Sequence, residues 1–306
     1  MTPAGAEAPR RITPLKAPVF APTGSGFPLS EDEIASRARA ALEEDRAAED
    51  VTTIATVISS RHSRAALVAR QDGVLAGVPL ALAAFHAMDP GVEIRVDAED
   101  GRRVSRGDLV LFLTGAARGL LSAERVALNF LQHLSGIASL TSRFVEAVEG
   151  TSATIVDTRK TTPGLRALEK HAVRCGGGAS HRAHLAAAVL IKDNHIAACD
   201  GDVALAVERA RAFAPSGMLL QVECDTIAQV RAAIAAGADA LLLDNMPIHA
   251  LRESVQLAKG GHCWTEASGG VTLATVREIA ECGVDRISIG AITHSAPVLD
   301  LGLDFE

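Results

Sequence analysis

The chain has 306 residues, a formal net charge of −7 at pH 7 and a hydrophobic fraction of 48%. This length accommodates one large domain or two modest ones, with enough material for a hydrophobic core. The acidic charge argues against a general nucleic-acid binder, which needs an extended basic surface.

The cysteines and the apolar pattern favour a cytoplasmic protein without a membrane partner. The five cysteines are scattered and form no Cys-x-x-Cys pair, which favours reduced thiols over a disulfide framework or a zinc site. No apolar run approaches the roughly 18 residues that a transmembrane helix needs. Arg10, Arg11 and Lys16 are not followed by an apolar segment, so a secretory signal is not expected, and an organelle transit peptide is the less favoured alternative.

The first half of the chain predicts a mixture of helices and strands. Residues 1–28, rich in Pro, Ala and Gly, are expected to form a flexible tail. Ser30 and Glu33 then form a capping box that predicts a helix. Residues 63–70 and 92–115 are typical of strands joined by Gly-containing turns. A long helix is expected from Ser122, although its Ser-x-x-Arg start is a weak cap.

After about Gly150, short apolar strands alternate with amphipathic helices. The predicted strands lie in residues 153–160, 187–195, 219–225, 238–245, 262–270 and 285–294. This alternation indicates a parallel sheet buried on both faces. We expect an incomplete β/α barrel, with a doubly wound open sheet as the competing architecture. No Gly-x-Gly-x-x-Gly follows a strand, which counts against a dinucleotide-binding version.

Polar side chains follow every one of these strands. They are Arg159, Lys160, Lys192, Asp193, His195, Glu223, Asp244, Glu266, Ser268, Ser288 and His294. In a parallel barrel the carboxyl ends of all strands open on the same face, where active sites form. A single such residue is most simply a solvated loop charge, but six strand ends together predict a shared site.

Residues 157–182 hold six Lys or Arg and only two carboxylates. Arg166 and Lys170 follow helical spacing from about Leu165, and we expect them on a solvated helix face. Gly176–Gly178 are expected to let backbone amides approach a ligand, or else to form a long flexible turn.

The remaining cations suggest an anion receptor. Guanidinium groups bind carboxylates through paired hydrogen bonds, so Arg159 and Arg182, with Lys192 and His181, would suit a small polyanion. Phosphate is expected where residues 266–270 run into a helix, and in the loop 288–295 after the last strand. Glu223 and Asp244 are candidates to share a Mg²⁺ ion or to bind sugar hydroxyls.

Six motifs in order resemble the quinolinate phosphoribosyltransferase family, also called carboxylating nicotinate-nucleotide pyrophosphorylases. They are residues 157–182, VLIKDNHI, VECDT, LLLDNM, EASGG and THSAPVLD. The resemblance runs from about residue 30 to the C-terminus. His171 departs from it, since an aromatic or small residue is common there.

The resemblance implies a two-domain fold, with an N-terminal α/β sandwich of residues 29–128 plus 296–306. Residues 129–295 would form an open α/β barrel of about seven strands. It implies a homodimer, or a hexamer of dimers, whose sites are completed by the neighbouring subunit. The implied reaction joins quinolinate to 5-phosphoribosyl 1-pyrophosphate with Mg²⁺, giving nicotinate mononucleotide, pyrophosphate and CO₂ in de novo NAD synthesis.

The resemblance also implies roles for particular residues. Lys160, Glu223 and Asp244 would be catalytic, and the two carboxylates would bind the metal. The quinolinate contacts would be Arg159, His181, Arg182 and Lys192, with Arg125 reaching into the partner's site. The phosphoribosyl and pyrophosphate contacts would be Thr158, Lys160, Ser268, Gly269, Gly270, Gly290, Ala291, Ile292 and His294.

Three alternatives remain open from the sequence. A related phosphoribosyltransferase-like protein associated with molybdenum transport shares the fold, but residues 158–164 and the His-Arg motif favour the quinolinate enzyme. A Schiff-base aldolase would use Lys192 as its nucleophile. A non-catalytic paralogue is disfavoured by the intact carboxylates Glu223 and Asp244.

Overall fold

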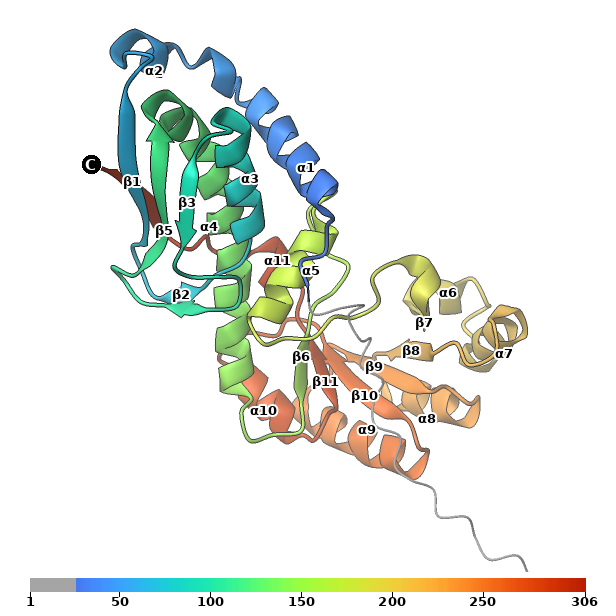
Figure 1. Ribbon diagram of the computed structural model, residues 1–306. Coiled ribbons are helices and arrows are strands. Elements are labelled where there is room, and N and C mark those ends of the chain that lie inside the picture. The colour runs from blue at the N-terminus through green and yellow to red at the C-terminus, as the bar shows by residue number, and fades with distance from the viewer. Residues whose placement is uncertain (1–25) are drawn as a thin grey trace, which may run out of the picture.

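The computed structural model describes residues 26–306, which form two packed bodies connected by one long helix (Figure 1). The predicted tail of residues 1–28 lies outside the described residues except for its last three. Within residues 26–306, no helix combines the length and apolar character needed to cross a lipid bilayer.

The first body is built on a four-stranded antiparallel sheet with the order β12-β1-β5-β3. Its strands are β1 His62–Ala69, β3 Glu93–Val96, β5 Leu109–Ala116 and β12 Leu301–Phe305. The C-terminal strand thus returns to the first body, where Phe305 lies opposite Ala65. Alternate residues of β1 are buried, as expected for a sheet with one face against a core. This agrees with the expected N-terminal α/β sandwich.

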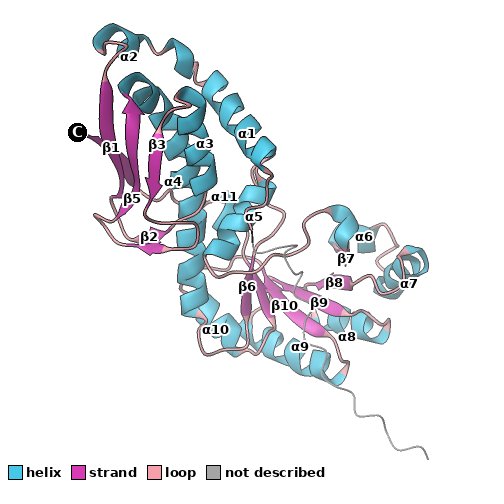
Figure 2. Ribbon diagram, viewed as in Figure 1, coloured by secondary structure: helices cyan, strands magenta, loops and turns pink. Residues whose placement is uncertain are grey.

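Helices pack on the buried face of this sheet (Figure 2). They are α3 Val78–Met88 and the first half of α4 Ala117–Ala147, and α1 Glu31–Glu44 packs on α3. A 3-10 turn Ala47–Glu49, α2 Val51–Thr56 and the paired short strands β2 Gly73–Val74 and β4 Arg103–Val104 complete the body. The capping box predicted for α1 is confirmed, because Glu33 N–H donates to Ser30 Oγ and Ser30 N–H donates to Glu33 Oε2.

The second body is a parallel sheet of six strands with the order β6-β11-β10-β9-β8-β7. The strands are β6 Thr154–Val156, β7 Val189–Ile191, β8 Leu220–Cys224, β9 Ala240–Asp244, β10 Trp264–Ser268 and β11 Arg286–Ser288. All six predicted strands are present. Neighbours follow chain order without a reversal and the first strand pairs with the last, which is the winding of a barrel rather than of a doubly wound sheet. A parallel bridge between Val156 and Ala179 marks a seventh position, and the barrel is open between this segment and β7.

Helices surround the barrel and bury the outer faces of its strands (Figure 2). They are α7 Val203–Phe213, α8 Ile227–Ala235, α9 Ile248–Gly260 and α10 Val276–Glu281. Helices α5 Arg166–Cys175 and α11 Ala291–His294 pack on α4, α6 Asp193–Ala197 packs on α7, and a 3-10 turn spans Leu185–Ala187. Strands β9 and β10 are buried at four of their five residues, as strands covered on both faces must be.

Helix α4 belongs to both bodies. Leu120 and Leu131 of its first half lie in the core of the sandwich, whereas Ile137 and Phe144 lie in the core of the barrel. The prediction that this helix begins at Ser122 is wrong, because it starts at Ala117, directly after β5. Ser122 was taken for a cap, but the preceding Ala-Arg-Gly-Leu-Leu is itself compatible with a helix.

A close contact fixes α4 against the returning C-terminal segment. A Cβ atom at Gly136 would lie 2.1 Å from the carbonyl oxygen of Pro297. The position therefore requires glycine, because the obstructing atom is backbone and cannot rotate away.

We expect Gly136→Ala to lower the free energy of unfolding by about 1–3 kcal/mol, the usual cost of overpacking. Gly260→Ala is the matched control, because its Cβ meets no atom within 4 Å and it too lies in a helix. Urea denaturation of the two variants checks this. Equal stability of both would contradict the close contact.

Candidate active site

The carboxyl ends of the barrel strands surround a cavity of about 360 Å³. Its lining residues are Thr158, Arg159, Lys160, His181, Arg182, Leu190, Lys192, Glu223, Leu242, Asp244, Glu266, Ser268 and Ser288. Side chains separated by up to 130 residues therefore meet in one place. This is what the polar residues at the ends of the parallel strands predict.

Positive charge in this cavity is incompletely neutralised. Four cations face three carboxylates, and Arg159, Lys160 and Arg182 form no ion pair within residues 26–306. Nε of Arg159 is buried without a hydrogen bond, whereas Arg182 donates to the carbonyl of Ala188. Burial, and then the nearby charge of Arg159, lower the pKa of Arg182. An anion bound between the two guanidinium groups would accept hydrogen bonds from the buried nitrogens and would reduce the repulsion between the two charges.

Two carboxylates lie beside these cations. Lys192 Nζ binds Oε2 of Glu223, and Asn245 donates to Oδ2 of Asp244 at 2.7 Å. In residues 26–306 the second oxygen of each carboxylate accepts no hydrogen bond. Two partly exposed carboxylate oxygens suit a Mg²⁺ ion that keeps several waters and takes substrate oxygens, but they cannot enclose one alone.

A buried network fixes the imidazole of His181 at the floor of the cavity. Arg182 N–H donates to His181 Nδ1 at 2.7 Å, so in the neutral ring the proton lies on Nε2. That nitrogen faces Oε2 of Glu266 at 3.4 Å. Burial raises the pKa of Glu266, but hydrogen bonds from His181, Ser288 and Gln221 outweigh burial and leave the pKa below its usual value. Glu266 is therefore an anion that orients His181.

The expectation that Lys170 lies on a solvated face is wrong. Its side chain is 6% exposed and its ammonium binds Asp157, at the end of β6. Burial raises the pKa of Asp157 and lowers that of Lys170. Asp157 also accepts the backbone N–H of His181 at 2.9 Å. The pair thus connects α5 to the segment that carries His181 and Arg182.

The glycine predictions also need correction. Gly176 and Gly178 pack on α4, where added Cβ atoms would lie 2.3 Å from the Ala138 carbonyl oxygen and 2.8 Å from Thr141. They serve helix packing rather than ligand approach. Gly269 and Gly270 have φ angles of +89° and +57°, so they form a left-handed turn that side chains disfavour. The helix expected directly after them begins only at Val276, because a turn intervenes. The two glycines therefore do not lie at a helix N-terminus, where a phosphate was expected to bind.

The residues expected to bind phosphate fall into two groups. Thr158, Lys160 and Ser268 line the cavity, whereas Gly269, Gly270, Gly290, Ala291, Ile292 and His294 stand outside that lining. The loop after β11 nevertheless touches Lys160, because a Cβ at Gly290 would lie 3.0 Å from Lys160 Cδ and 3.1 Å from His294 Nε2. Ile292 is fully buried and exposes no atom to this cavity.

Arg125 does not join this cluster within one chain. It is exposed on α4 and lines a separate cavity of about 480 Å³ with Asp45, Asp50 and Ser122.

Several lining residues had no assigned role in the sequence analysis. Glu266 lies on β10 and Ser288 is the last residue of β11, and their place near strand ends is the one indication that the sequence offers. Leu190 and Leu242 gave none, because an apolar strand residue that faces the barrel interior looks like any core residue.

A parallel α/β barrel with a cation-lined cavity at its carboxyl edge defines an enzyme that acts on small polyanions. Residues 50–135 match the quinolinate phosphoribosyl transferase N-terminal domain, and residues 137–304 match the C-terminal domain. The chain belongs to the quinolinate phosphoribosyltransferase family, as its motifs predicted.

Relatives agree along nearly the whole length. The chain is 44% identical over 271 residues to the nicotinate-nucleotide pyrophosphorylase [carboxylating] of Mycobacterium leprae, covering 87% of this chain and 95% of that protein. It is 41% identical to the probable enzyme of Bacillus subtilis, covering 85% and 89%. The crystal structure of NadC from Streptococcus pyogenes matches with a TM-score of 0.85 at 42% identity, covering 91% and 99%.

We expect Lys170→Met to lower the free energy of unfolding by about 3–5 kcal/mol, because it leaves Asp157 buried without its partner. Lys259→Met, at an exposed position of α9, is the control and should change stability little. Chemical denaturation measures both. A solvated Lys170 would instead give two indistinguishable curves.

Proposed function

We propose that the cavity at the barrel mouth transfers a phosphoribosyl group from 5-phosphoribosyl 1-pyrophosphate to quinolinate and releases CO₂, giving nicotinate mononucleotide and pyrophosphate. This is the activity that the relatives' names state. The observation that carries the proposal is a set of three cations, Arg159, Lys160 and Arg182, that form no ion pair with any residue of the described range 26–306. They line one cavity together with Glu223 and Asp244. The step belongs to de novo NAD synthesis.

The two arginines hold the dicarboxylate. Arg159 and Arg182 follow two neighbouring segments, which pair at Val156 and Ala179. Paired hydrogen bonds from their guanidinium groups to the carboxylates fix the plane of the pyridine ring. Lys192 and His181 complete the contacts. Immobilising the ring with its nitrogen toward C1′ of the sugar supplies the entropic part of the catalysis.

Charge complementarity supplies the electrostatic part of the catalysis. When pyrophosphate leaves, C1′ becomes cationic and the leaving oxygens become more negative. Glu223 and Asp244 stabilise the sugar cation, and Lys160, with its stem against Gly290, neutralises the leaving group. The pyridine nitrogen then bonds to C1′ without a covalent enzyme intermediate.

Loss of CO₂ follows from the product's own electronics. The pyridinium formed at the ring nitrogen accepts the electron pair that remains at C2 when the C–C bond to the carboxylate breaks. A proton taken up at C2 restores neutrality there.

The two carboxylates also fit a Mg²⁺ ion delivered with the pyrophosphate. Glu223 and Asp244 each keep one oxygen available, and hard oxygen ligands are the ones that this ion prefers. When bound, Mg²⁺ supplies charge neutralisation of the leaving pyrophosphate.

The proposal includes a homodimer, or a hexamer of dimers, in which Arg125 enters the partner's cavity. Its support is that Arg125 is an exposed cation that lines a different cavity of its own chain from the one at the barrel mouth. The proposal also places the enzyme in the cytoplasm, supported by five cysteines that are all free thiols.

The aldolase alternative is disfavoured by the state of Lys192. A Schiff-base lysine must be desolvated and neutral, whereas this side chain is 46% exposed and its ammonium binds Glu223.

The function is tested by following nicotinate mononucleotide and CO₂ formed from quinolinate, with nicotinate as the control substrate. With 5-phosphoribosyl 1-pyrophosphate present, product from quinolinate but not from nicotinate supports the proposal, and no product under saturating Mg²⁺ overturns it.

In the same assay Arg182→Ala should weaken quinolinate binding by ~2–5 kcal/mol, because it leaves a carboxylate unpaired. Arg231→Ala, an exposed arginine on α8, is the matched control. Unchanged quinolinate affinity in Arg182→Ala would contradict the assigned role.

Subunit sharing is tested by mixing two inactive variants, Arg125→Ala and Arg159→Ala. A heterodimer contains one site with both arginines intact, so random exchange should restore about a quarter of the wild-type activity. Each variant mixed with itself is the control. Failure to recover activity after demonstrated exchange would show that Arg125 acts within its own chain or not at all.

A further inference from the structure

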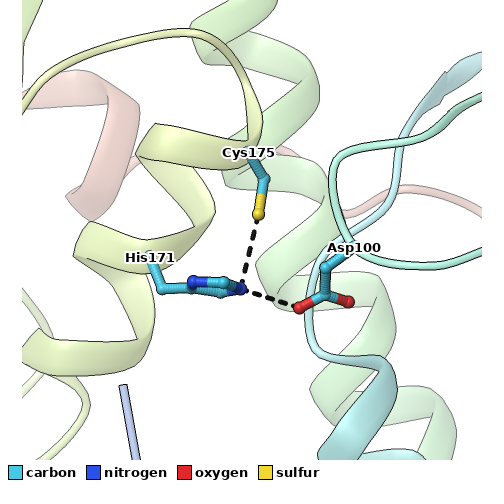
Figure 3. A group of neighbouring side chains, drawn as sticks. All are labelled: Asp100, His171 and Cys175. Atoms are coloured by element: carbon cyan, nitrogen blue, oxygen red, sulfur yellow. Dashed lines mark hydrogen bonds and ion pairs between the residues drawn. The ribbon is translucent and has the colours of Figure 1, made fainter. Parts of the chain in front are cut away.

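We propose that Asp100, His171 and Cys175 form a Zn²⁺ site that joins the sandwich to the barrel, a site separate from the catalytic cavity and independent of the proposed function. Asp100 lies in the turn between β3 and β4 of the sandwich, and His171 and Cys175 lie one helical turn apart on α5 (Figure 3). Within residues 26–306 this is the one group of three such residues whose donor atoms lie close enough to share an ion.

The donor atoms converge on one point. His171 Nε2 is 2.8 Å from Asp100 Oδ2 and 3.4 Å from Cys175 Sγ, and all three atoms lie within 4.8 Å of one another. In a tetrahedral zinc site, bonds of about 2.0–2.3 Å place ligand atoms roughly 3.4–3.6 Å apart. The sulfur already meets that spacing, and the carboxylate needs to move by roughly half an ångström, which a side-chain rotation provides.

The same geometry excludes a proton relay of the Cys–His–Asp kind. Such a relay needs the thiol on one ring nitrogen and the carboxylate on the other. Here both groups face Nε2 of His171. A shared cation, by contrast, needs all three donor atoms on the same side, as they are here.

The donor set selects zinc. One imidazole nitrogen, one thiolate sulfur and one carboxylate oxygen suit Zn²⁺, while Mg²⁺ prefers oxygen ligands only. Three protein ligands leave the fourth position to water. A cavity of about 530 Å³, lined in part by Glu99, Asp100, His171 and Cys175, gives access for the ion and room for that water.

The ligands are held by their surroundings. Val78 N–H donates to Oδ1 of Asp100 at 2.8 Å, which leaves Oδ2 directed at the cluster. Phe27 packs edge-on against the His171 ring, with centroids 4.9 Å apart. The side chains of His171 and Asp100 are only 11% and 14% exposed. Ordered ligands of this kind lose little entropy when they bind an ion.

Binding replaces the proton on the sulfur. The reaction is Zn²⁺ plus thiol giving zinc thiolate plus H⁺, because the thiolate is the form that ligates the ion. Besides the three proposed ligands, the charged side chains that line this cavity are Glu99 and Arg174.

The experiment uses the full chain stripped of metal and then titrated with Zn²⁺ or Co²⁺ alone. We expect one Zn²⁺ bound per chain by equilibrium dialysis, a higher thermal unfolding midpoint with Zn²⁺, and a thiolate-to-cobalt charge-transfer band with Co²⁺. The band distinguishes this site from Glu223 and Asp244, which have no sulfur. Cys175→Ser should abolish the band and the midpoint shift, whereas Cys199→Ser, a cysteine of similar exposure, should keep both.

Asp100→Asn keeps an acceptor for Val78 N–H and provides a second variant that preserves the fold. It should weaken zinc binding at least tenfold while the metal-free unfolding midpoint stays near that of the wild type. Absence of the cobalt band in the wild type, or a band that persists in Cys175→Ser, would overturn the proposal and leave the cluster as a hydrogen-bonded contact between the two bodies.

Discussion

The cost of gathering like charges in a partly buried space governs this structure. Arg159 and Arg182 repel each other at the barrel mouth, and no carboxylate of residues 26–306 pairs with either. Flexible loops would separate them, so rigid elements must hold them. Strand β6 ends three residues before Arg159 and anchors its loop, and the Lys170–Asp157 pair fixes the segment of Arg182 to α5. The two arginines repel each other in the free enzyme, and an anion bound between them would be attracted by both. The rigid fold thus holds the cations ready for the ligand before it binds.

Helix α4 makes the two bodies one mechanical unit. Its thirty-one residues contribute to both hydrophobic cores, and glycines on it and at the end of α5 allow backbones to approach closely. Helix α5 in turn carries Lys170 toward the active site and His171 with Cys175 toward the sandwich. Helix α5 therefore links the junction of the two bodies to the segment that carries Arg182.

The sequence predicted the fold where periodicity is local and strong. All six barrel strands and the cap of α1 followed from apolar runs and from Ser30 with Glu33. It failed where distant segments decide. Lys170 has the spacing of a surface residue, and only the approach of Asp157 shows that it is buried. The Gly176–Gly178 run looked like a ligand loop because nothing local reveals that α4 lies against it. Leu190 and Leu242 became cavity walls only through barrel closure.

The return of β12 to the edge of β1 sets an order of events during synthesis. Residues 301–305 are translated after the barrel strands, so the sandwich lacks its edge strand until the barrel has been made. Until then the backbone groups of β1 on that side stay unpaired, a template for association with other nascent chains. The sandwich is thus the first body to begin folding and the second to be completed, and loss of residues 301–305 would expose a strand of the body that is translated first.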